Sequence, residues 1–267
     1  MKVRSVFISD VHLGTRGCNS SALLEFLREV QTDHLYLVGD IIDLWSLRKT
    51  FYWPQEHNNV LRTILGKAKH GTRVIFVPGN HDEDFREFAG TSFGNLEILR
   101  DCIHVTALGQ RLLVLHGDEF DSIVKFNPWL AAFGSRAYDF SIEINRHFNR
   151  VRQFFGYPYW SLASYLKDKV KNAVKYISSF EHAVAHEARR RNVDGVVCGH
   201  IHRAEITYIN AVLYCNDGDW VESCSALVED RNGRLAIWKW NEMRDGMRPV
   251  LGRTRPDSSP ALGASFG

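Results

Sequence analysis

The sequence predicts a layered α/β fold, because strand and helix patterns alternate along the first half of the chain. Residues 3–9, 34–38 and 73–77 are short apolar runs with the length and composition of buried strands. Between them, residues 21–30 and 58–68 carry apolar side chains at helical spacing. Strands that alternate with helices favour a parallel sheet covered by helices.

The second half of the chain repeats this pattern and ends in shorter strands. Residues 111–115 and 193–198 are again apolar runs typical of strands. Three further strands are expected at residues 211–215, 225–229 and 235–239. The turn sequences Asn216-Asp217-Gly218 and Asn232-Gly233 separate them, which favours antiparallel pairing among these three strands.

A segment between the two halves has a different character. From residue 125 to residue 180, apolar and aromatic side chains recur every three or four positions, and Gly156-Tyr157-Pro158 interrupts the pattern. We therefore expect one domain over residues 1–252, with a helical cap inserted at about 125–180. Residues 253–267 are rich in Pro, Ser, Gly and Ala and are expected to form a disordered tail.

The composition is that of an ordinary globular protein. The 267 residues are 45% hydrophobic and 24% charged, with a formal net charge of +2. Five cysteines without a Cys-x-x-Cys pair indicate free thiols in a reducing compartment. The N-terminus has a strand pattern instead of a signal peptide, and no apolar run approaches the ~20 residues of a membrane span. We expect a cytoplasmic protein that is soluble or attached peripherally to the inner face of the inner membrane.

Five polar segments follow the predicted strands. They are Asp10-Val11-His12, Gly39-Asp40, Gly79-Asn80-His81-Asp82, His116-Gly117-Asp118 and Gly199-His200-Ile201-His202. A single His or Asp at a strand end is usually a helix cap or a surface residue. Five such segments, each at a strand end where α/β folds place their ligands, indicate a metal site instead. Carboxylate oxygen, amide oxygen and imidazole nitrogen together suit Mn, Fe or Zn.

This order of motifs resembles the calcineurin-like metallophosphoesterase superfamily, whose pattern runs Asp-x-His, Gly-Asp, Gly-Asn-His-(Asp/Glu), His and Gly-His-x-His. The resemblance spans residues 10–202 and implies a two-sheet α/β/β/α sandwich with metals at the strand ends. It also implies two divalent metal ions, for which we expect Mn ahead of Fe or Zn. By position, Asp40 would bridge the metals, and the remaining ligands would divide into Asp10, His12 and His202 for one metal and Asn80, His116 and His200 for the other.

The same resemblance places His81 next to the substrate as a catalytic residue. Two cations about 3.5–4 Å apart can share one water and lower its pKa toward neutrality, so that the resulting hydroxide attacks phosphorus. His81 can stabilise the charge on the phosphoryl group or protonate the leaving oxygen. Asp82 either orients His81 as a second catalytic residue or caps the helix that follows. Asp43 either holds His12 or caps the helix after it.

A narrower resemblance concerns the substrate. Asp10-Val11-His12-Leu13, the run Gly-Asp-Ile-Ile-Asp-Leu-Trp at residues 39–45, and the helical insert before Gly199 resemble the UDP-2,3-diacylglucosamine diphosphatase branch. That branch cleaves the diphosphate of a nucleotide-linked lipid in lipid A biosynthesis, and its cap holds the acyl chains. It carries Arg where this chain has His81. The expected substrate-binding residues are Lys167, Lys171 and Asp121.

The charge of the insert fits such a substrate. Residues 125–175 contain nine basic and three acidic residues, a net charge of +6, so the remainder of the chain carries −4. A basic, aromatic cap suits a diphosphate and an anionic membrane surface, although a helical hairpin with a solvated basic face gives the same pattern. Lys167 and Lys171 are four residues apart and share one helix face.

Two other functions fit the same motifs. A nuclease or a cyclic-nucleotide phosphodiesterase would use the same metal site, and the basic insert would then contact nucleic acid. A binding module without catalysis would be expected to have lost a ligand or His81, whereas all are present here. We therefore predict a dinuclear-metal phosphohydrolase acting on a nucleotide-linked lipid or another phosphodiester, and keep the nuclease as the alternative.

Overall fold

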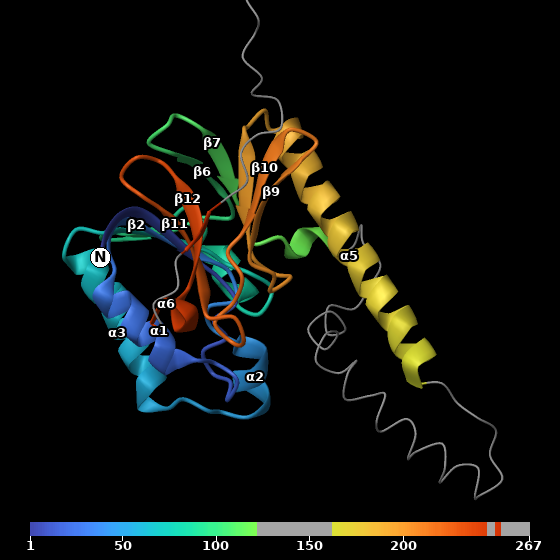
Figure 1. Ribbon diagram of the computed structural model, residues 1–267. Coiled ribbons are helices and arrows are strands. Elements are labelled where there is room, and N and C mark those ends of the chain that lie inside the picture. Colours follow the sequence, from blue (N-terminus) through green and yellow to red (C-terminus); the bar gives the residue numbers. More distant parts are fainter. Residues whose placement is uncertain (122–161, 245–248, 252–267) are drawn as a thin grey trace, which may run out of the picture.

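The fold is an α/β/β/α sandwich, in which two β-sheets pack face to face between helices (Figure 1). The computed structural model describes residues 1–121, 162–244 and 249–251.

The first sheet has eight strands, in the order β13 (Val250–Leu251), β12 (Leu235–Lys239), β11 (Ser225–Glu229), β1 (Lys2–Ile8), β2 (Gln31–Val38), β3 (Arg73–Val77), β5 (Leu96–Ile98) and β4 (Ser92–Phe93). The second has five, in the order β6 (Cys102–Val105), β7 (Arg111–Val114), β8 (Gly195–Cys198), β10 (Val212–Asn216) and β9 (Glu205–Ile209). The expected fold class is confirmed.

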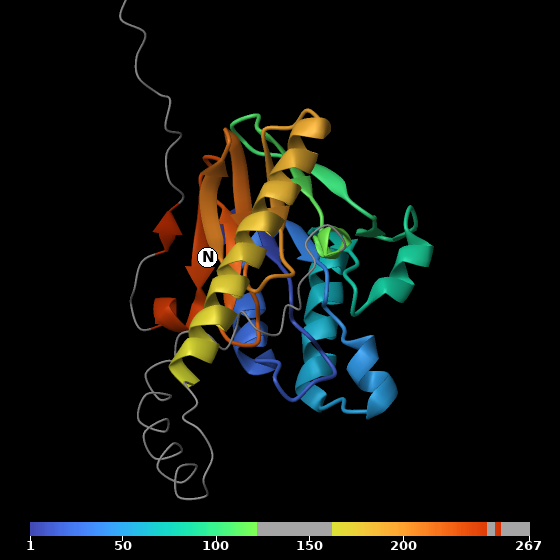
Figure 2. The same cartoon turned by 90° about the vertical axis from the view of Figure 1, so that its right-hand side faces the viewer.

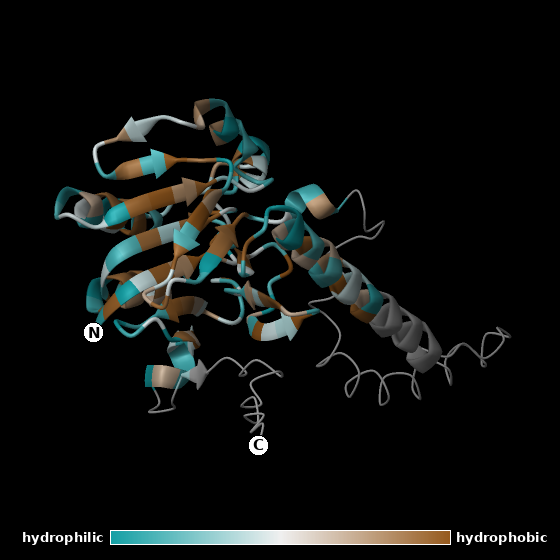
Figure 3. Ribbon diagram, turned by 90° about the horizontal axis from the view of Figure 1, so that it is seen from above, coloured by the Kyte–Doolittle hydropathy of each residue, from teal (hydrophilic) through white to brown (hydrophobic). Residues whose placement is uncertain are grey.

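Alternate residues of the central strands pack on the two faces of each sheet. In β2, Leu35 and Leu37 pack with helices α1 (Ser20–Glu29) and α3 (Gln55–Lys69), while Tyr36 and Val38 face the second sheet. In the second sheet, Val196 and Cys198 of β8 pack against helix α5 (Leu162–Arg190), and Val197 faces the first sheet. Because both faces are buried there, the second half of β2 and the whole of β8 contain no polar side chain except the Tyr36 hydroxyl, and the hydrophobic residues gather on the strands in Figure 3.

The direction of the central strands decides where the site forms. β1, β2 and β3 run parallel in the first sheet, and β7, β8 and β10 run parallel in the second. Parallel strands bring their carboxyl ends to one edge of a sheet. The polar segments that follow these strands therefore lie on common edges.

One expected strand pairing is wrong. β10 does not pair with β11 around the turn at residues 216–218; it lies in the second sheet, parallel to β8 and antiparallel to β9, and the chain then crosses to β11 in the first sheet. Asn216 and Asp217 resemble turn residues in sequence, but both are fully buried where the two sheets meet. The other expected hairpin, β11–β12, is antiparallel as expected, and Gly233 in its turn has a positive φ of 81°.

Helix α5 extends beyond the expected end of the insert at residue 180. Its C-terminal half packs on the second sheet through Tyr176, Phe180 and Val184, and its N-terminal end projects past the sandwich (Figures 1 and 2). Residues 125–161 of the expected cap and the expected tail at 253–267 lie outside the described residues, as do the side chains of Lys167 and Lys171. Within the described ranges, no helix is both long and apolar enough to cross a membrane.

A buried carboxylate joins the two sheets beside Ser5, in the middle of β1. Glu229 is fully buried and accepts hydrogen bonds from Arg4 (2.7 Å), Ser5 (2.7 Å) and the backbone N–H of Ala107 (2.7 Å). The Nε2 atom of His104, from the second sheet, lies 2.9 Å from Glu229 Oε2. Burial alone would raise the pKa of Glu229, but these hydrogen bonds lower it to about 2.

Glu229→Gln should lower the free energy of unfolding by about 1–3 kcal/mol, because charged hydrogen bonds to a buried group are lost. The folded pKa of Glu229 lies below its ordinary value of 4.5, so the stabilisation is fully present above pH 4.5 and is lost as the pH falls toward 2. In urea unfolding, the difference between the wild type and the variant should shrink below pH 4.5. A difference that stays constant down to about pH 3 would contradict this assignment.

Candidate metal centre

The five polar segments meet at one edge of the sandwich, as expected. Strands β1, β2 and β3 of the first sheet, and β7 and β8 of the second, each lead into one of them. The side chains that these segments bring together are those of Asp10, His12, Asp40, His116, His200 and His202. Asn80 directly precedes His81, whose backbone N–H donates to Asp40 Oδ1 at 2.9 Å. Both sheets therefore contribute expected ligands.

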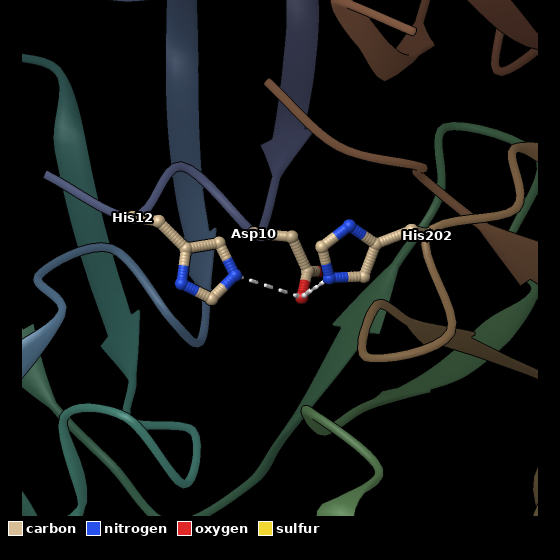
Figure 4. Close-up of side chains that lie close together, drawn as sticks. All are labelled: Asp10, His12 and His202. Carbon is tan, nitrogen blue, oxygen red and sulfur yellow. Dashed lines mark ion pairs between the residues drawn. The ribbon is translucent and has the colours of Figure 1, made fainter. Parts of the chain in front are cut away.

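One group of ligands surrounds the carboxylate of Asp10 (Figure 4). The Nε2 atom of His202 lies 3.1 Å from Asp10 Oδ1, and that of His12 lies 3.9 Å from the same oxygen. The three ligand atoms all lie within 4.8 Å of one another. Both imidazoles point toward the carboxylate, so the group can close around one cation.

Asp40 connects this group to a second one. Its Oδ2 atom lies 3.9 Å from His12 Nε2, and its Oδ1 atom lies 3.5 Å from His116 Nε2. The Nδ1 atom of His116 hydrogen-bonds with the backbone oxygen of Val38 at 2.8 Å, so Nε2 is the ring nitrogen that faces the centre. Asp40 thus presents one oxygen to each group.

His200 has the opposite ring orientation. Its Nε2 atom lies 2.9 Å from Asp121 Oδ1, which leaves Nδ1 as the ring nitrogen for a metal. Its ring centroid lies 5.2 Å from that of His116. Asp121, expected to bind substrate, lies against His200 and also accepts a hydrogen bond from Tyr176 at 2.7 Å.

The backbone is strained at most of the expected ligands. Five of them have positive φ: Asp10 (49°), His12 (53°), Asp40 (54°), His200 (68°) and His202 (52°). A positive φ in a residue other than glycine costs on the order of 1–3 kcal/mol and persists only where the surroundings hold it. A Cβ atom at Gly79 would overlap the Asp40 carboxylate and the His116 ring, so only glycine fits there.

The residues present fit a metal. Within the described part of the chain, buried polar atoms without a hydrogen-bond partner include Asp10 Oδ1, Asn80 Oδ1 and His116 Nε2. Each unsatisfied buried polar atom lowers the stability of the fold by about 1–3 kcal/mol. Three expected ligand atoms are unsatisfied in this way. Burial lowers the pKa of His202, but the Asp10 carboxylate raises it to about 9. A cation would satisfy these atoms and displace that proton.

Asp43 combines both roles considered for it. Its Oδ2 atom lies 3.3 Å from His12 Nδ1, and its Oδ1 atom accepts the backbone N–H of Ser46 at 2.6 Å at the start of helix α2 (Leu44–Lys49). The same Oδ2 atom lies 3.0 Å from His81 Nδ1. Asp43 therefore contacts an expected ligand and the expected catalytic histidine at once.

His81 lies at the mouth of the centre, with its side chain 25% exposed. Its Nε2 atom lies 3.9 Å from Asp40 Oδ2, and its ring centroid lies 4.3 Å from that of Trp45. Burial alone would lower the pKa of His81, but the Asp43 and Asp40 carboxylates raise it. His81 can thus meet a molecule that enters the centre and carry a proton to it.

The structure does not place Asp82 beside His81, where it was expected. Asp82 is fully buried and accepts backbone N–H groups of Gly79 (2.6 Å), Ile41 (2.7 Å) and Ile42 (3.2 Å). It also makes no cap hydrogen bond to the short helix that follows. A carboxylate can accept several converging N–H groups at once. Asp82 therefore joins the backbone that precedes Asn80 to the backbone that follows Asp40.

Two residues near Asp10 were not expected from the sequence. Ser9 Oγ lies 2.5 Å from Asp10 Oδ2 and 2.6 Å from Asp217 Oδ1. Burial and the nearby Asp10 carboxylate raise the pKa of Asp217 well above its ordinary value. A protonated Asp217 can donate to Ser9, which then donates to Asp10. The position of Asp217 in an apparent turn sequence gave no signal of this role.

A model of the family described as calcineurin-like phosphoesterase matches residues 3–204. The chain belongs to the calcineurin-like phosphoesterase family. Its members are metal-dependent phosphoesterases, so this chain is a metal-dependent hydrolase of phosphate esters.

Two relatives of this phosphoesterase carry the same name. A protein of Neisseria meningitidis serogroup A named UDP-2,3-diacylglucosamine hydrolase is 27% identical over 249 residues, which cover 86% of this chain and 96% of the relative. A Vibrio cholerae protein of the same name is 24% identical over 254 residues, covering 85% and 94%. Among solved structures, a phosphoesterase from E. coli is 17% identical with a TM-score of 0.46, covering 89% and 93%.

Replacing Asp40 by Asn should test the link between the two ligand groups. The neutral amide presents one oxygen instead of two, so the phosphoesterase should lose metal and its turnover should fall by on the order of 10³-fold. Metal content by elemental analysis and hydrolysis of bis(p-nitrophenyl) phosphate measure both effects. Glu229→Gln, which neutralises a buried carboxylate far from the centre, is the matched control. Unchanged metal content and rate in Asp40→Asn would refute the link.

Proposed function

We propose that this phosphoesterase binds two divalent metal ions and hydrolyses the diphosphate of a nucleotide-linked lipid such as UDP-2,3-diacylglucosamine. The observation that carries the dinuclear centre is the position of Asp40, with its two oxygens 3.9 Å from His12 Nε2 and 3.5 Å from His116 Nε2. A carboxylate that faces two ligand groups can bridge two cations. Mixed oxygen and imidazole ligands suit Mn, with Fe or Zn as alternatives.

The family's motif order supports a division of the ligands between the two metals. Asp40 would contact both, and the other ligands would be Asp10, His12 and His202 for one metal and Asn80, His116 and His200 for the other. When bound, the metals supply Lewis-acid activation of water and neutralise charge on the phosphoryl group. Asp43 holds the His12 ring by its Nδ1 atom, and the backbone of Val38 holds the His116 ring in the same way.

His81 is the proposed acid. With Nδ1 directed at Asp43, its Nε2 atom faces the centre, and the neighbouring carboxylates raise the pKa of His81. A protonated Nε2 can stabilise charge on the phosphoryl oxygens or give its proton to the leaving oxygen. The Trp45 ring packs on His81 and limits its movement.

The lipid substrate is supported by the relatives. Proteins named UDP-2,3-diacylglucosamine hydrolase align with about 85% of this chain and with nearly their whole length. Helix α5 carries Lys167 and Lys171, and its N-terminal end projects beyond the second sheet. We propose these two lysines as contacts for the diphosphate or for an anionic membrane surface.

His81→Ala should keep both metals yet lose about 10²–10⁴-fold in rate, because it removes the proposed acid and no ligand. Loss of a metal in this variant would instead make His81 a ligand. His81→Arg restores a cationic side chain and introduces the residue of the lipid A branch, so it should recover part of the rate and shift preference toward UDP-2,3-diacylglucosamine. Steady-state kinetics with metal analysis on each purified variant distinguish these outcomes.

The substrate class is tested by a panel of hydrolysis assays with added Mn. We expect the highest kcat/KM for UDP-2,3-diacylglucosamine in detergent micelles, over bis(p-nitrophenyl) phosphate, cyclic nucleotides and single-stranded DNA. Asp40→Asn is the control for contaminating activity. A preference for single-stranded DNA that falls steeply with salt would instead identify a nuclease, and a preference for cyclic nucleotides would reject the lipid substrate.

A further inference from the structure

We propose that Asp121 and Tyr176 position the His200 ring for metal binding, and so link helix α5 to that half of the centre. Both are positioning residues, since they act through His200. The inference rests on the proposed function, in which His200 is a metal ligand. It assigns to Asp121 a role other than the substrate contact expected from the sequence.

The contacts form a chain of hydrogen bonds from α5 to the centre. Asp121 Oδ1 lies 2.9 Å from His200 Nε2 and accepts the Tyr176 hydroxyl at 2.7 Å. His200 and Tyr176 are buried, with 6% and 4% of their surface exposed. A buried hydroxyl and a buried ring therefore share one carboxylate oxygen, which fixes the position of that oxygen between them.

The bond from Asp121 selects the tautomer of His200. A carboxylate beside Nε2 keeps the proton on that nitrogen, so Nδ1 carries the lone pair that a metal needs. His12 and His116 have the reverse arrangement, with Nδ1 held by Asp43 and by the Val38 backbone oxygen. Each of these three histidines thus has one ring nitrogen held by the protein and the other left for the centre.

Helix α5 also holds the His200 ring by packing. Phe180 lies one helical turn after Tyr176 on the same face, and its ring centroid is 5.9 Å from that of His200. A Cβ atom at Gly117, the residue after His116, would overlap the Phe180 ring. The helix therefore fits closely against the segments that carry both histidines.

The charge of Asp121 argues against contact with the phosphates. Asp121 Oδ1 lies 2.9 Å from His200 Nε2 and 2.7 Å from the Tyr176 hydroxyl. A carboxylate offers only acceptor atoms and repels a diphosphate. An anionic carboxylate beside a ligand histidine instead makes that imidazole a stronger donor to a metal.

The test measures metal binding apart from catalysis. Mn²⁺ is titrated calorimetrically into the chelator-treated full chain, and kcat and KM are measured on bis(p-nitrophenyl) phosphate. Asp121→Ala should weaken one of the two Mn²⁺ sites by about 10–100-fold and leave the other unchanged. Asp121→Asn should weaken it less, because the amide oxygen still accepts a hydrogen bond. Excess Mn²⁺ should restore part of kcat in both variants.

Tyr176→Phe is a milder variant that can be measured even if Asp121→Ala does not fold. It removes one hydroxyl and keeps the ring that packs beside Phe180. We expect it to weaken the same Mn²⁺ site several-fold. Tyr36→Phe is the matched control, because the Tyr36 hydroxyl also contacts a buried histidine, His104, at 2.9 Å. It should leave both Mn²⁺ affinities unchanged. If both tyrosine variants weakened Mn²⁺ binding equally, Tyr176 would contribute only to the stability of the fold. That result would overturn the link between helix α5 and the centre.

Two further outcomes separate this inference from the proposed function. Unchanged Mn²⁺ affinities in Asp121→Ala, with a raised KM for UDP-2,3-diacylglucosamine, would make Asp121 a substrate contact and overturn the positioning role alone. His200→Ala should lose the same Mn²⁺ site that Asp121→Ala weakens. Two intact Mn²⁺ sites in His200→Ala would show that His200 is not a ligand, which overturns the proposed ligand set and the inference together.

Discussion

Asp40 has to face two ligand groups at once, with Oδ1 toward His116 and Oδ2 toward His12. This constraint determines much of the surrounding backbone. Asp40 has a positive φ, and the N–H groups of the two residues after it are bound by the buried Asp82 carboxylate. Gly79 leaves the space that the Asp40 side chain occupies. A strained turn persists here because hydrogen bonds and packing fix it from several sides.

Hydrogen bonds orient the rings of three of the proposed ligand histidines. His12 and His116 are each bound at Nδ1, whereas His200 is bound at Nε2 by a carboxylate that also contacts α5. The partners differ in kind: a side-chain carboxylate at a helix N-terminus, a backbone oxygen of β2, and a carboxylate bonded to a tyrosine. Each fixes one ring nitrogen before any cation arrives, which lowers the entropy cost of forming the centre.

The sequence predicted the central strands, the long helices and the convergence of the five polar segments, because apolar periodicity and strand-end motifs are local signals. It did not predict β4, β5, β6, β9 and β13, because these short strands contain few consecutive apolar residues. The pairing of β10 failed for a different reason. Asn216 and Asp217 are turn formers when exposed, and only the tertiary structure shows that they are buried.

The same limit applies to the contacts among the site residues. Sequence proximity suggested Asp82 as the partner of His81, yet the carboxylate beside His81 belongs to Asp43, from the preceding polar segment. Ser9 and Asp217 are 208 positions apart, and Asp121 and His200 are 79 apart. Spacing along the chain carries no information about such pairs.

Two polar contacts that cross from the first sheet to the second have a consequence for the sandwich as a whole. Apolar contact between two sheets is not directional, so by itself it leaves one sheet free to slide over the other. Beside the middle of β1, Glu229 meets His104 across the interface, and just after the end of β1 the Asp10 carboxylate accepts the backbone N–H of His200 at 2.9 Å. Hydrogen bonds are directional, so such contacts favour one alignment of the two sheets. The polar contacts between the sheets therefore add a preferred alignment that the apolar core alone does not specify.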